Sequence, residues 1–153
     1  MVKSKEGKKF EGEFVKSFNF NYGDRKEFAI VRLKDCGTIK RADVGDYLVF
    51  YKNVVLNIEL KAQENGILYT SEIRDSQFQK WLSFEYQKIR IPIWIIKNES
   101  TREIAIYFKT TMQKLYKGTK ITPQDADFII KYNNGVCPYN LAPLFTKIDE
   151  YVK

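Results

Sequence analysis

Hydrophobic side chains recur every three or four residues in several parts of the chain, a spacing typical of helices that bury one face. The first helix is predicted over residues 5–18, whose phenylalanines fall on one face. A second helix is predicted over residues 75–87, and a closing helix over residues 139–151. Thr122 followed by Pro123 predicts a further helix start, because threonine caps a first turn and proline is tolerated at the first helical position.

Short runs rich in β-branched and aromatic residues predict strands between these helices. The runs are residues 27–34, 46–51, 54–61, 92–97 and 103–108. Because strands alternate with helices, the expected fold class is α/β, with a central mixed β-sheet flanked by helices. The length of 153 residues fits one domain, with a core over about 5–117 and a C-terminal helical extension over about 118–153.

The two neighbouring runs within residues 46–61 are predicted to form a hairpin with Lys52 and Asn53 as its turn. Residues whose numbers add up to 105 then face each other, so Asp46 lies opposite Glu59. Side chains alternate between the two faces of a strand, so Glu59 and Lys61 share one face while their apolar neighbours point to the other. The hairpin is therefore expected to bring two carboxylates and a lysine together.

Two carboxylates placed side by side destabilise a sheet unless a cation compensates their charge. Mg²⁺ prefers one or two carboxylates together with water and phosphate oxygens, so Asp46 and Glu59 are candidate metal ligands. Glu11 lies beside the apolar stripe of the first helix and is a possible further ligand, whereas Glu6 and Glu13 are predicted to point outward. The alternative is that this polar face is the solvated side of an antiparallel sheet.

Composition restricts the chemistry that the chain can perform. It contains no histidine, which excludes His general bases, Ser-His and Cys-His nucleophile pairs, and zinc sites with His ligands. The net charge of +7 suits a polyanionic partner, although residues 46–73 carry four acidic residues against two lysines. Two cysteines without CxxC spacing and the lack of a long apolar segment predict a soluble cytoplasmic protein with no membrane contact.

The segments that carry these residues resemble the PD-(D/E)XK nuclease superfamily, and within it the RecU and archaeal Hjc Holliday-junction resolvases. Glu59-Leu60-Lys61 resembles the (D/E)XK triplet, and thirteen positions separate Asp46 from Glu59, a spacing similar to theirs. The opening helix with Glu11 and the later helix with Gln77 are similar to elements of RecU. Gly45 stands where proline is usual before the aspartate, and residues 34–45 are too short for the RecU stalk, which favours a compact Hjc-like architecture.

The resemblance implies a restriction-endonuclease-like core and a phage-type, Mg²⁺-dependent endonuclease, in which Mn²⁺ would substitute. Such an enzyme cuts four-way DNA junctions symmetrically as a homodimer, leaving 5′-phosphate ends, and a phage enzyme would act in the bacterial host. Lys61 is expected to orient the attacking water, and Gln77 to position the phosphate or the water. The expected metal ligands are Asp46, Glu59, the Leu60 carbonyl and Glu11.

Basic residues spread along the chain are expected to contact DNA phosphates, which makes binding sensitive to salt and independent of base sequence. They are Lys5, Lys8, Lys9, Lys40, Arg41, Arg74, Lys80, Lys88 and Arg90. Two alternatives remain open. One is a restriction- or repair-type DNA endonuclease with the same core, which would cut linear or damaged duplex as readily as branched DNA. The other is a basic DNA-binding module without catalytic activity.

Overall fold

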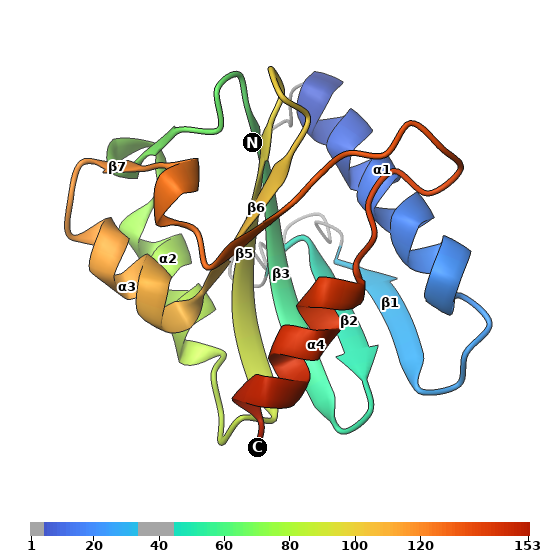
Figure 1. Cartoon of the computed structure of the whole chain (residues 1–153). Helices are drawn as coiled ribbons and strands as arrows, with labels where there is room; N and C mark the ends of the chain where they lie inside the picture. Colours follow the sequence, from blue (N-terminus) through green and yellow to red (C-terminus); the bar gives the residue numbers. More distant parts are fainter. Residues whose placement is uncertain (1–4, 34–44) are drawn as a thin grey trace.

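The computed structural model describes residues 5–33 and 45–153, and these form helices on both sides of a twisted sheet (Figure 1). Two short 3₁₀ turns, Thr70–Glu72 and Pro123–Asp125, join the main elements. The helices and strands are α1 (Lys5–Tyr22), β1 (Phe28–Arg32), β2 (Tyr47–Tyr51), β3 (Val54–Gln63), β4 (Leu68–Tyr69), α2 (Asp75–Ser83), β5 (Arg90–Asn98), β6 (Ile104–Phe108), α3 (Lys109–Tyr116), β7 (Lys120–Ile121), β8 (Phe128–Ile130) and α4 (Ala142–Tyr151).

The central sheet has six strands in the order β1-β2-β3-β5-β6-β8. The pair β3 and β5 is parallel, and every other neighbouring pair in this sheet is antiparallel. The parallel pair is possible because α2 lies in the connection between the two strands, which is long enough for a crossover. The expected α/β fold with a mixed sheet flanked by helices is therefore confirmed.

Each face of the sheet has its own hydrophobic core. One core joins α1 and α4 to the sheet, and it includes the even-numbered residues Leu56, Ile58 and Leu60 of β3. The other core joins α2 and α3 to the opposite face, where Trp94 of β5 packs edge-on against Trp81 of α2. The odd-numbered positions of β3 therefore face the α2 side of the sheet.

The predicted hairpin and its register are confirmed. Tyr51 pairs with Val54 and Tyr47 with Ile58, so Lys52 and Asn53 form the turn, and paired residue numbers add up to 105. Lys52 has a φ of 53°, the left-handed conformation that tight hairpin turns require.

Some boundaries and connections differ from the prediction. The helix expected over 75–87 ends at Ser83, because Gln87 and Lys88 have positive φ in the turn that leads into β5. The closing helix begins at Ala142. Helix α3 was not predicted, because only one of its residues is fully buried. Residues 118–153, expected to be helical, also contain β7 and β8, and β8 extends the central sheet.

The expectation that Glu13 points outward is wrong. Its carboxylate lies 2.7 Å from the ammonium of Lys97 at the end of β5, and both side chains are largely buried. Glu6, by contrast, is exposed as predicted. No helix within the described residues is long and apolar enough to cross a membrane.

Candidate active site

The candidate site lies on the α2-facing side of the β2–β3 hairpin. Glu59 is 5% exposed at an odd-numbered position of β3, and Asn57 on the same face is completely buried. Asp46 immediately precedes β2, and its N–H donates to the Ile58 carbonyl at 2.8 Å. Ile58 is already paired with Tyr47, so two successive residues lie opposite it, as in a β-bulge, and the regular register ends at Tyr47. The placement of Asp46 directly opposite Glu59 therefore stays a prediction.

The Asp46 carboxylate is held by the backbone of β3. Its Oδ2 accepts a hydrogen bond from the Leu60 N–H at 2.7 Å. In a strand, the N–H and C=O of one residue point to the same side, so the Leu60 carbonyl is also directed toward the side where Asp46 lies. Two of the predicted metal ligands, the Leu60 carbonyl and the Asp46 carboxylate, therefore lie on the same side of β3.

Two further predicted residues contact Glu59. The Lys61 ammonium lies 3.5 Å from Glu59 Oε1 and 5.9 Å from the centre of the Trp94 ring. Gln77 of α2 donates from Nε2 to the same Glu59 oxygen at 3.3 Å. Gln77 can reach the strand because the next residue, Phe78, is buried beneath the helix and turns this part of α2 toward the sheet.

Glu11 occupies a separate position on the other side of the sheet. It is 6% exposed, and its carboxylate lies 3.9 Å from Arg32 Nε. Burial is the main reason that the pKa of Tyr47 rises to about 12, and the charge of Glu11 and a hydrogen bond to it raise that pKa further. Within residues 5–33 and 45–153, no three Asp, Glu, Cys or His side chains lie close enough to hold a metal together. Glu11 is therefore not brought into one cluster with Asp46 and Glu59.

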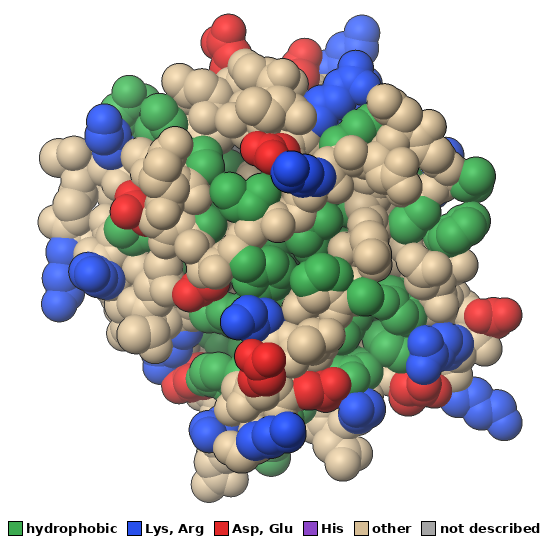
Figure 2. Space-filling view, viewed as in Figure 1, with side chains coloured by type: hydrophobic (Ala, Val, Ile, Leu, Met, Phe, Trp, Pro, Cys, Tyr) green, Lys and Arg blue, Asp and Glu red, His purple; other side chains and the backbone are tan. Residues whose placement is uncertain are grey.

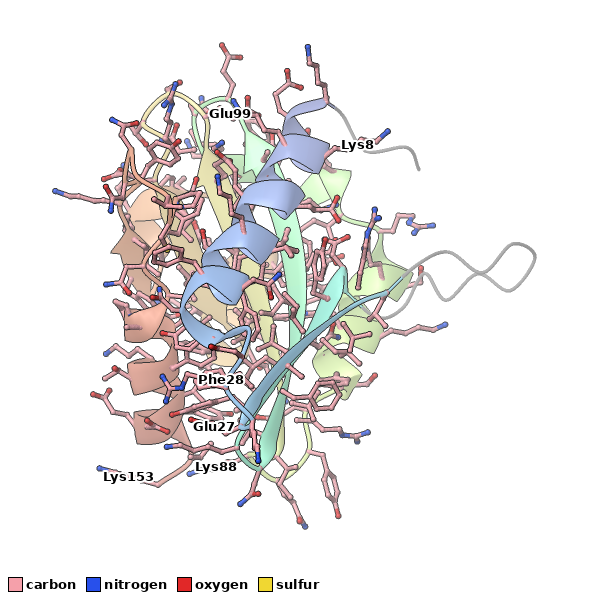
Figure 3. The ribbon with its side chains drawn as sticks, turned by 90° about the vertical axis from the view of Figure 1, so that its right-hand side faces the viewer. Lys8, Glu27, Phe28, Lys88, Glu99 and Lys153 are labelled. Carbon is pink, nitrogen blue, oxygen red and sulfur yellow. The ribbon has the colours of Figure 1, made fainter. Side chains whose placement is uncertain are left out.

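The basic residues expected to contact DNA are divided between the two ends of the molecule. Figure 3 shows Lys8 at one end, where α1 begins, and Lys88 at the other. Arg90 pairs with Val55, four positions before the Trp94–Glu59 pair, which is about 13 Å along the strand.

Their neighbours also differ. Lys88 donates to the terminal Lys153 carbonyl at 3.4 Å, and Arg90 lies over the Phe84 and Tyr86 rings.

Other basic residues lie on either side of Gln77 and at the start of α1. Arg74, directly before α2, and Lys80 on α2 are three residues before and after Gln77, and both are exposed. Lys5, Lys8 and Lys9 are exposed in the first turns of α1. Lys40 and Arg41 lie outside the described residues. The face seen in Figure 2, over α4, mixes acidic and basic side chains and offers no uniformly basic surface.

Sequence reasoning assigned no role to Asn57, although the structure connects it to the candidate site. Its Oδ1 accepts the Gly45 N–H at 2.7 Å, directly before Asp46. An asparagine flanked by apolar residues in a buried strand was the available signal, because buried amides are kept where they have hydrogen-bond partners.

Comparisons with known proteins support the fold. No protein-family profile matches the chain, and no curated protein matches it in sequence. Among solved structures, the chain is similar to Hjc, a Holliday junction resolvase from the archaeal hyperthermophile Archaeoglobus fulgidus. The TM-score is 0.60 at 14% sequence identity, and the match covers 95% of this chain and 99% of the other. At this identity the similarity shows that the two chains share a fold.

Proposed function

We propose that this chain is a metal-dependent DNA endonuclease that resolves four-way junctions. Its strongest support is Glu59, a nearly buried carboxylate on a central strand that is contacted by Lys61 and Gln77, while the Asp46 carboxylate accepts the N–H of the next residue, Leu60. Ionised side chains are rarely buried without a specific partner or function. The fold shared with a protein described as a Holliday junction resolvase supports the same reaction.

The donor set fits a hard divalent cation. Asp46, Glu59 and the Leu60 carbonyl supply oxygen atoms only, and Mg²⁺ commonly binds one or two carboxylates and completes its shell with water and phosphate oxygens. We therefore propose these three groups as Mg²⁺ ligands, with Mn²⁺ able to substitute. Glu11, which packs on the α1 side of the sheet, is not among the proposed ligands.

Mg²⁺ in such a site supplies Lewis-acid polarisation of the scissile phosphate. The Lys61 ammonium, 3.5 Å from Glu59 Oε1, would balance the charge of Glu59 and orient the attacking water. The Gln77 amide holds the Glu59 carboxylate and can turn a donor toward a phosphate oxygen. Attack in line with the leaving 3′-oxygen gives 5′-phosphate and 3′-hydroxyl ends.

DNA contacts would be made mainly to phosphates. Arg74 and Lys80 flank Gln77, and the first turns of α1 are basic. Lys88 and Arg90 would reach a different part of the substrate, which suits a branched DNA with several arms. Binding by phosphate contacts weakens steeply as salt concentration rises.

Two symmetric cuts require two active sites, so we propose a two-fold homodimer. The site-bearing face of the sheet continues across β2 and β1 as apolar side chains, among which Phe50 and Val31 are 38% and 45% exposed. A second copy of the chain is the expected occupant, because this surface adjoins the site and self-association would withdraw it from water.

The decisive experiment compares a labelled four-way junction with a duplex of matched sequence, in Mg²⁺ and in EDTA. Wild type should nick the junction symmetrically and only with Mg²⁺, and Asp46→Asn should abolish nicking while still binding the junction in Ca²⁺. Asp24→Asn, an exposed position in the turn after α1, is the matched control and should cut normally.

Each contrary result favours a different function. Equal cutting of junction and duplex would support a restriction- or repair-type endonuclease on this fold. Junction binding without any cleavage, equal in Mg²⁺ and EDTA and unchanged in Asp46→Asn, would support a DNA-binding module without catalytic activity.

A further inference from the structure

Asn57 is a buried polar residue whose hydrogen bonding is incomplete. It lies two positions before Glu59 on β3 and is 0% exposed. Its Oδ1 accepts the Gly45 N–H at 2.7 Å, but its Nδ2 has no hydrogen-bond partner among the described residues. A buried donor left without a partner costs about 1–3 kcal/mol. The amide is therefore a poor choice for stability alone, and its carbonyl oxygen is the group that makes a specific contact.

That contact fixes the backbone in front of Asp46. A Cβ added at Gly45 would lie 2.6 Å from Asn57 Oδ1 and 2.6 Å from the Ile58 carbonyl oxygen, so only glycine allows this close approach. Proline at this position would also have no N–H to donate. Gly45 and Asn57 thus form a close pair, in which the glycine N–H donates to the amide oxygen and has no side chain to push it away.

The next contacts along the chain pass this restraint to the candidate metal ligand. The Asp46 N–H donates to the Ile58 carbonyl at 2.8 Å, and the Asp46 Oδ2 accepts the Leu60 N–H at 2.7 Å. Three hydrogen bonds from β3 therefore hold two consecutive residues. Asn57 makes the first of them and is the only one of the three that acts through its side chain.

We propose that Asn57 is a positioning residue, which acts through Gly45 to hold the Asp46 carboxylate in its metal-binding orientation. The metal-binding part of this inference rests on the proposed function, whereas the restraint on Asp46 does not. Asn57 itself touches neither metal nor DNA. Its loss should weaken metal binding without removing a ligand.

Amide hydrogen exchange in the metal-free protein tests the restraint directly, because the Leu60 N–H reports on the position of the Asp46 carboxylate. In Asn57→Leu, the amides of Gly45 and Leu60 should both exchange about tenfold faster or more, since each loses a hydrogen bond. Leu56, in the same strand, should keep its protection, which shows that the sheet is intact. Asp46→Ala gives the exchange rate of Leu60 without its acceptor.

The conservative variant Asn57→Asp retains an oxygen that accepts the Gly45 N–H, so it should keep the Leu60 amide protected. If leucine disrupts the strand, Asn57→Ser serves instead, because its hydroxyl is too short to reach Gly45. An unchanged Leu60 amide in both Asn57→Leu and Asn57→Ser overturns the inference, even if cleavage falls.

Metal titration completes the test. Asn57→Leu should raise the half-saturating Mn²⁺ concentration about tenfold, by calorimetry and in cleavage assays, and saturating metal should restore most of the cleavage rate. If wild type neither binds metal nor cuts junctions, the proposed function fails while the exchange result still decides whether Asn57 positions Asp46. If wild type binds and cuts but Asn57→Leu titrates like wild type, the positioning role fails alone.

Discussion

Removing one partner of the buried ion pair between Glu13 and Lys97 should destabilise the protein much more than replacing both partners with apolar side chains. Their charged atoms lie 2.7 Å apart, and the side chains are only 14% and 8% exposed. Removing one partner leaves the other charge buried, which typically costs about 3–5 kcal/mol. For a protein of this size, that corresponds to a fall in Tm of roughly 6–20 °C in Glu13→Gln or Lys97→Met.

The double variant Glu13→Leu/Lys97→Met should recover most of this loss, because replacing a buried pair by apolar side chains is often neutral or stabilising. Urea and thermal unfolding followed by circular dichroism measure all corners of the cycle. Glu150→Gln, which breaks the exposed pair with Lys147, is the matched control and should change stability by less than about 1 kcal/mol. Single variants as mild as this control, or a double variant as unstable as the sum of the singles, would refute the reasoning.

Other residues give sharper functional and pH tests. Gln77→Ala should lower the cleavage rate with little effect on junction binding in Ca²⁺, whereas its neighbour Gln79→Ala should cut normally; equal rates would exclude a role for Gln77. A hydrogen bond from Lys109, and to a smaller extent one from Tyr151, lowers the pKa of Glu85 below its ordinary value of 4.5. The free energy of unfolding of wild type should therefore exceed that of Glu85→Gln by a constant amount above about pH 4.5, and this difference should disappear as the pH falls through the lowered pKa of Glu85. A difference that persists in acid would contradict the assignment to these hydrogen bonds. Phe50→Lys should shift sedimentation from dimer to monomer without unfolding the chain, and an unchanged dimer would place the interface elsewhere.

The parts of the fold that the sequence predicts best are those set by short-range patterns. The β2–β3 register follows from a two-residue turn at Lys52 and Asn53 together with the alternation in β3, and both are properties of adjacent residues. The same arithmetic predicts Asp46 opposite Glu59, but the ladder ends one residue earlier, at Tyr47, because Asp46 also bonds to Ile58. Helix α1 was likewise predicted from its buried phenylalanines, although it continues to Tyr22.

The parts that sequence missed depend on contacts between distant segments. A helical wheel places Glu13 outward because it cannot show Lys97, 84 positions away along the chain. Gln77 reaches Glu59 only because the packing of α2 on the sheet orients it. The role of Asn57 could not be predicted because it depends on where the backbone runs at Gly45. That path is set by contacts with β3 and not by any local pattern.

The first turn residue, Lys52, lies six positions from Asp46, about 20 Å along the strand. Because side chains alternate between faces, inserting or deleting one residue there would move Asp46 to the opposite face from Glu59 and separate the carboxylates without altering either of them. Variation in the length of this distant loop is therefore as damaging to the proposed chemistry as substitution of a ligand, whereas its composition can change freely as long as a tight turn still forms.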